Sequence, residues 1–145
     1  MPDPDAPLLS YIIGRLDRAI RNRLIEILTP LELSIPQFTT LSVLKRRPGL
    51  SNAQLARRAL ILPQSMIQVI AALETRRLVE RAPNPSHNRI LQTRLTAAGL
   101  ALVERAEAAT HEFESDLIAA VGDGDEARRA IDVMQLWLET LRSDR

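Results

Sequence analysis

The amino-acid sequence predicts a mainly α-helical fold with a small β hairpin (α+β), and two observations support this. Apolar residues recur at helical spacing through most of the 145 residues. The exception is segment 78–95, where two short extended runs flank a stretch rich in Pro, Asn and Ser. Helix breakers separate the helical runs, so each element can be justified in turn.

The first helical run begins at Pro7 and is stopped by Pro30. Leu8 and Tyr11 add apolar surface beyond one stripe, so we expect the N-terminal half to contact more than its own domain. The stripe itself consists of Leu9, Ile12, Ile13, Leu16, Ile20, Leu24, Ile27 and Leu28.

Two shorter helices follow. The first begins after Ser34, carries Pro36 in its first turn, where a missing N–H is harmless, and ends in the basic run 45–47 before Pro48. Ser51 is predicted to cap the second, Asn52–Ala59. Its buried residues are expected to be Leu55, Ala56 and Ala59.

The next helix is predicted to run from Pro63 to Arg76 or Arg77, and its two faces differ in chemistry. The inner stripe is Met66, Val69, Ile70 and Leu73, and the outer face is Gln64, Ser65, Gln68, Ala71, Ala72 and Thr75. Gln and Ser side chains near a helix start can reach base edges in the DNA major groove. Ile67 borders the outer face, where it could meet a thymine methyl group or belong to the core.

A hairpin is predicted next. Residues 78–81 and 90–95 read as its strands, and Pro83 to Asn88 as a long tip. Arg89 stands at the return of that tip, placed for a narrow minor groove. Segment 34–95 is therefore predicted to be a winged helix-turn-helix, a DNA-binding lobe.

Two further helical runs close the chain. Thr96 caps a long run that ends at Gly122-Asp123-Gly124, and an apolar helix follows to Leu141. A lone winged helix needs neither these helices nor an apolar first helix. We therefore predict a homodimer, with segments 7–29 and 97–142 as dimerisation helices of a single domain that covers residues 1–145.

The charge distribution supports a nucleic-acid partner. Segment 45–95 holds ten basic and two acidic residues, a net charge of +8, whereas the whole chain carries only +1, which leaves −7 for the remainder. Concentrated positive charge is expected of a surface that binds phosphates.

Composition narrows the functional classes. The absence of cysteine excludes disulfides and thiolate metal sites, and no apolar run is long enough to span a membrane. The polar cluster Glu107, His111, Glu112 and Glu114 offers at most two metal ligands on one helix face. We therefore expect a cytoplasmic protein that is not an enzyme, with no catalytic residue, no metal site and no cofactor.

The order of elements, together with "QLARRALILPQSMIQVIAALETRRLVER" and "LTAAG", resembles the MarR family of transcriptional regulators. The resemblance implies a homodimer that binds a palindromic operator in double-stranded DNA, usually as a repressor. It also implies release of the operator when a small aromatic or phenolic ligand binds between the dimerisation helices and the DNA-binding lobe.

The wing departs from the family pattern. Arg89 matches the arginine of the family's Asp-x-Arg element, but His87 stands where the aspartate would be, with Asn88 between them. A neutral His87 can accept a hydrogen bond from Arg89, whereas a protonated one would repel it and attract phosphate. The predicted DNA-binding residues are Ser51, Gln64, Ser65, Gln68, Arg76, His87, Asn88 and Arg89.

A second function stays open at this level. Winged helices also serve as protein-interaction modules without DNA binding, although a charge of +8 on the motif argues against that use here. For the effector, Tyr11, Phe38 and Phe113 are candidates to line a pocket. The chain has only four aromatic residues, however, and a core position is favoured for each.

Overall fold

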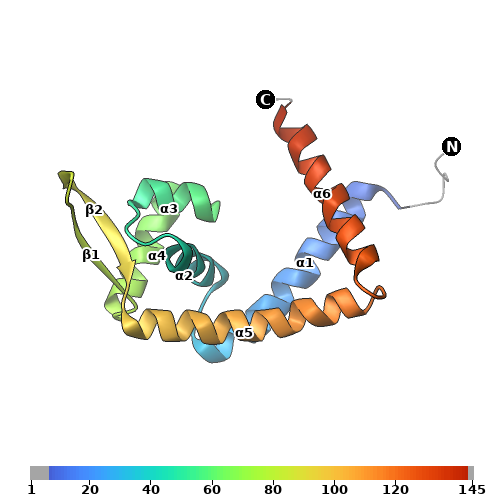
Figure 1. The fold of residues 1–145 in the computed structure, drawn as a ribbon, viewed down its shortest axis with the longest axis horizontal. Coiled ribbons are helices and arrows are strands. Elements are labelled where there is room, and N and C mark those ends of the chain that lie inside the picture. The colour runs from blue at the N-terminus through green and yellow to red at the C-terminus, as the bar shows by residue number, and fades with distance from the viewer. Residues whose placement is uncertain (1–6, 144–145) are drawn as a thin grey trace. The chain divides into compact units, whose positions relative to one another are not determined.

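The computed structural model describes residues 7–143, apart from the side chains of His87 and Asn88. The described chain forms six α-helices, one 3₁₀ helix and a two-stranded hairpin (Figure 1). It separates into two compact units, one ending at Glu107 and the other beginning at Ala108. The mainly α fold with a β wing is confirmed.

In the first unit, α1 (Leu9–Leu28) leads through the 3₁₀ helix η1 (Thr29–Leu31) to α2 (Ile35–Arg46). The start of α2 is fixed by a capping box. The Ser34 hydroxyl accepts the backbone N–H of Gln37 at 3.2 Å, and the Gln37 side chain accepts the N–H of Ser34 at 3.0 Å. This end of α2 is therefore specified locally, as the Ser34–Pro36 signal predicts.

The next helix, α3 (Asn52–Ala59), begins with the same device, because the Ser51 hydroxyl accepts the N–H of Gln54 at 3.3 Å. Leu60 then turns the chain in the left-handed region, with a φ of 55°. The following helix, α4 (Pro63–Thr75), contacts both α2 and α3 (Figure 1). These contacts build the helix-turn-helix around a fully buried inner face of α4, namely Met66, Ile70 and Leu73.

The hairpin consists of β1 (Val79–Asn84) and β2 (His87–Leu95), paired antiparallel. The predicted long tip is wrong, because only Pro85 and Ser86 form the turn. Pro83 is tolerated in a strand here, since a two-stranded sheet has only edge strands. The Asn84 side chain tightens the turn by accepting the N–H of Ser86 at 2.8 Å.

The base of the wing is tied to the helices by backbone hydrogen bonds. The Thr93 N–H donates to the Leu50 carbonyl at 2.8 Å, and the Gly49 N–H donates to the Thr93 carbonyl at 3.2 Å. The segment between α2 and α3 thus pairs with the edge of β2 that faces away from β1. This pairing holds the wing in place against the helix-turn-helix.

The long helix α5 (Ala97–Ala119) begins where the wing ends. The Thr96 hydroxyl accepts the N–H of Gly99 at 3.0 Å and donates to the Arg77 carbonyl at 2.7 Å. A Cβ on Gly99 would lie only 1.9 Å from the Leu78 carbonyl oxygen, so the close approach of α5 to the segment just before β1 requires glycine here.

The core of the first unit draws on every helix up to the first half of α5. Leu28 of α1, Leu41 of α2 and Val103 of α5 are all fully buried, and Ala106 is the last apolar residue of this cluster. The first turns of α5 therefore serve the lobe's own packing. The assignment of 97–142 to dimerisation stays a prediction.

The second unit contains the end of α5 and α6 (Asp125–Ser143), joined through Gly122 and Gly124, both at positive φ. Every described residue of α6 is exposed except Ala127. Its apolar face remains uncovered in the single chain, with Ile131, Met134, Leu138 and Leu141 all at least 38% exposed.

Candidate nucleic-acid interface

The outward face of α4 carries the predicted base-reading residues. Gln64, Ser65 and Gln68 are exposed, on the side opposite the buried stripe. Leu62, the residue before the helix, provides no side-chain cap to the first N–H groups of α4. Free N–H groups at a helix start suit a phosphate oxygen. This end of α4 can therefore offer both side chains to bases and backbone donors to phosphate.

Ile67 is 57% exposed, so the alternative in which it belongs to the core is wrong. Its position 100° round the helix from Met66 turns it away from the buried stripe. It adjoins the outward face, beside Gln68.

The wing presents Arg89 on an irregular part of the hairpin. Asn84 pairs with His87 and Pro83 with Leu91, so residues 88–90 are extra on β2. Such a bulge redirects side chains, and Arg89 is exposed. His87 and Asn88 belong to β2, but their side chains lie outside the described set. The predicted roles of His87 and Asn88 therefore stay predictions.

Two predicted site residues have structural partners. The Ser51 hydroxyl caps α3. The Arg76 guanidinium donates to the carbonyls of Glu32, at 2.5 Å, and Leu31, at 3.5 Å. Arg76 thereby fastens the end of α4 to the turn before α2. The spacing of α4 shows only that Arg76 is exposed, and no sequence signal points to these two carbonyls.

Arginines surround the ends of α2 and α3. One shallow hollow of about 310 Å³ is lined by Val43, Arg46, Arg47 and Arg58. A second, of about 340 Å³, is lined by Gln54, Arg57 and Arg58. Guanidinium groups are well suited to bidentate phosphate contacts. The sequence gives only the net charge of segment 45–95. In the structure, part of the positive charge of this segment lies around Arg58.

Lys45 is engaged differently. Its ammonium lies 2.6 Å from a carboxylate oxygen of Glu107, and the Arg46 guanidinium lies 3.9 Å from the other oxygen. Glu107, the first member of the candidate metal cluster, is thus committed to an ion pair. Within the described residues no group of three His, Cys, Asp or Glu side chains could hold a metal ion, and no helix is long and apolar enough to cross a membrane.

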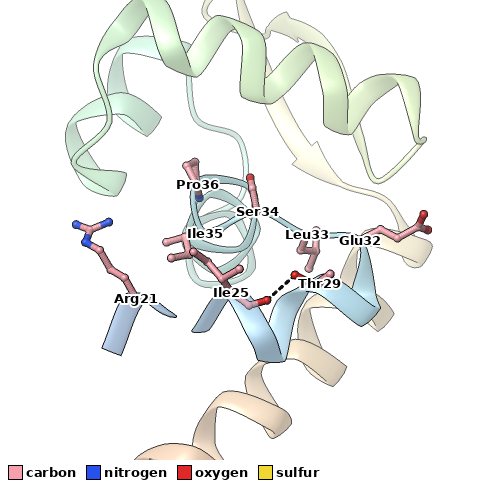
Figure 2. A pocket seen from close by; sticks show the side chains of 8 residues that line it. All are labelled: Arg21, Ile25, Thr29, Glu32, Leu33, Ser34, Ile35 and Pro36. Atoms are coloured by element: carbon pink, nitrogen blue, oxygen red, sulfur yellow. Dashed lines mark hydrogen bonds between the residues drawn. The ribbon is translucent and has the colours of Figure 1, made fainter. Parts of the chain in front are cut away.

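A separate hollow of about 500 Å³ lies where α1 meets η1 and the start of α2 (Figure 2). Its walls combine the guanidinium of Arg21 with the apolar side chains of Ile25, Leu33, Ile35 and Pro36. Arg21 donates to the carboxylate of Asp17 at 3.0 Å. None of Tyr11, Phe38 or Phe113 lines this hollow.

An exposed polar helix face, a hairpin with a projecting arginine and a basic surface define a winged helix-turn-helix DNA-binding protein. Residues 31–90 match the family model described as MarR family. The chain is also 40% identical to the HTH-type transcriptional repressor Rv2887 of Mycobacterium tuberculosis, over 79% of this chain and 82% of that protein. The protein belongs to the MarR family, whose members are transcriptional regulators rather than enzymes.

Solved structures agree with this assignment. The transcriptional repressor CouR, bound to a 23-mer DNA duplex, aligns with a TM-score of 0.79 and 27% identity, over 93% of this chain and 92% of that one. Rv2887 in complex with salicylic acid aligns with a TM-score of 0.69 and 35% identity, over 92% and 98%.

Proposed function

We propose that the protein is a homodimeric repressor that binds a palindromic operator in double-stranded DNA through α4 and the wing. The observation that carries the proposal is the pairing of two DNA-reading elements in one lobe. The outward face of α4 exposes Gln64, Ser65 and Gln68, and the wing bulge exposes Arg89. The similarity to CouR, solved on a DNA duplex, supports the same use of this lobe.

The two elements have different tasks. A glutamine can bind adenine with two hydrogen bonds in the major groove, while an arginine inserted in the minor groove reads its width and potential. The arginines around Arg58 supply affinity that does not depend on sequence. Asn88 and His87 are proposed to support Arg89 at the wing tip, and Ser51 to place the start of α3 near a phosphate.

Selection of bound fragments from genomic DNA tests the function. A single palindromic sequence should be recovered, and the affinity for it should fall steeply with salt. For each phosphate that the protein neutralises, the logarithm of the binding constant should fall by roughly 0.9 per tenfold rise in salt concentration. Recovery of no sequence, together with affinity independent of salt, would favour the protein-interaction module instead. Recovery next to a promoter would support repression, and we propose the cytoplasm as the location of the protein.

The effector is proposed to be a small aromatic acid bound in the hollow at α1, η1 and α2. A volume of about 500 Å³ is ample for such a ligand, whose ring would contact Ile25, Ile35 and Pro36. Its carboxylate would form an ion pair with the Arg21 guanidinium in place of the exposed Asp17. The salicylate complex of Rv2887 supports this ligand class.

Salicylate is the probe for this part of the proposal. It should weaken operator binding by the wild-type protein, and Arg21→Gln should need a higher salicylate concentration for the same effect. Glu26→Gln, also on the exposed side of α1, is the matched control. If salicylate leaves operator binding unchanged, the effector proposal fails while the DNA-binding proposal stands.

A further inference from the structure

Ile67 is a large aliphatic residue among the exposed residues of α4, which are otherwise polar or small. Its neighbours on the helix surface are Gln64 and Ala71, three and four positions away, and Gln68 follows it in sequence. These neighbours are polar or small, yet Ile67 leaves a large aliphatic side chain 57% exposed. Exposure of such a side chain is unfavourable in water, so a complex in which a partner covers Ile67 would be stabilised.

The apolar exposure around Ile67 is local. Among the described residues of 34–95, the large apolar side chains that are exposed lie either near the start of α4 or on β2: Leu60, Leu62, Ile67, Ile90 and Leu91. These are the two elements proposed to enter DNA. The remaining exposed large apolar residues of the described chain lie in α1, α5 and α6 or within two residues of them.

The major groove offers one apolar group, the 5-methyl of thymine, and it lies on the same base pair as the adenine edge that glutamine binds. On α4 the row of Gln64 and Gln68 runs beside the row of Ile67 and Ala71, because positions three and four apart are neighbours. The outward face is thus polar on one side and apolar on the other.

We propose that Ile67 is a specificity-determining residue that contacts a thymine methyl group in each half of the operator, beside an adenine bound by Gln64 or Gln68. The inference rests on the proposed DNA binding and adds which base chemistry the helix selects. It also accounts for a recognition helix whose outward face carries no basic residue between Gln64 and Thr75.

Replacement of thymine by uracil tests the contact, because uracil keeps the base pairing and removes only the methyl group. The probe is a synthetic duplex with the sequence recovered by selection, in which each thymine position is exchanged for uracil in turn. At one position in each half-site the wild-type protein should bind about fourfold more weakly per methyl removed.

The matching protein variant is Ile67→Ala, which should bind the thymine and uracil duplexes equally. Ile67→Val, which keeps a branched side chain, should retain part of the preference. Leu136→Ala removes an exposed apolar side chain of α6, on the face opposite Met134 and Leu138, and should keep the full preference for thymine.

The outcomes separate the two proposals. Tight binding with no thymine preference at any position would overturn the role of Ile67, and so would an Ile67→Ala variant that keeps the preference. Failure of the wild-type protein to bind any duplex would instead overturn the proposed function.

Discussion

The two units of the chain bury their apolar residues to very different extents. All fifteen buried apolar residues of the described chain lie at or before Ala106, in the unit that holds the winged helix. In the other unit, the apolar stripe of α6, from Ile131 to Leu141, is exposed. The lobe is therefore stable through its own core, whereas we propose that the terminal helices gain their stabilisation from a second chain. The variants below test this contrast.

Removal of a buried side chain from the lobe should have the largest effect. Leu73→Ala empties part of a fully buried site under α4 and should lower the free energy of unfolding by about 2–5 kcal/mol. Urea unfolding at a fixed protomer concentration measures it. Gln68→Ala, on the outward face of the same helix, should change stability by less than about 0.5 kcal/mol. Similar losses for both variants would contradict the assignment of the two faces.

A charge on the α6 stripe should break the dimer and spare the lobe. Leu138→Asp places a carboxylate in the proposed interface and should weaken dimerisation by about 3 kcal/mol, a shift of roughly two orders of magnitude in dissociation constant. Sedimentation velocity across a concentration series measures it. Thr140→Asp introduces the same charge on the opposite face of α6 and should leave the dimer intact. A Leu138→Asp protein that stays dimeric would remove α6 from the interface.

DNA affinity should depend on the exposed wing. Arg89→Ala should weaken operator binding by about 1–3 kcal/mol, since Arg89 projects from the bulge of β2. Arg105→Ala removes an exposed arginine of α5, outside the basic segment, and is the matched control in a gel-shift titration. Equal effects of the two variants would mean that Arg89 acts through overall charge alone.

Much of this fold could be predicted because its signals are local. Ser34 and Ser51 mark helix starts through capping boxes, and the spacing of Met66, Ile70 and Leu73 marks the buried face of α4. The predicted wing tip is too long because proline is typical of turns, whereas an edge strand tolerates Pro83. Local patterns cannot show whether a neighbouring strand needs a given N–H.

The site was less predictable where it depends on contacts between distant segments. Arg76 reaches carbonyls 44 and 45 residues away, and Lys45 pairs with Glu107 across 62 residues. Nothing in the spacing of either helix indicates these partners. Ile67 is an intermediate case, since helical periodicity put it on a border and only the packed structure shows it exposed.

The smallest expected effect comes from the ion pair at the last residue of the lobe. Lys45 and Glu107 join the end of α2 to α5 at 2.6 Å, one residue before the next unit begins. Both side chains retain solvent contact, at 32% and 25% exposure, so water screens much of their attraction. We expect a coupling free energy of about 0.5–1 kcal/mol from a double-mutant cycle of Lys45→Ala and Glu107→Ala in urea unfolding.

Salt gives this last prediction its control, because screening should reduce the coupling free energy at 1 M salt, where the Debye length is about 3 Å. The Arg46 guanidinium, 3.9 Å from Glu107, can compensate partly when Lys45 is removed, which keeps the expected value low. A coupling above about 2 kcal/mol would mean that the junction of α2 and α5 is rigidly specified. The packing of the lobe on α5 would then depend on electrostatics as well as on the burial of Val103 and Ala106.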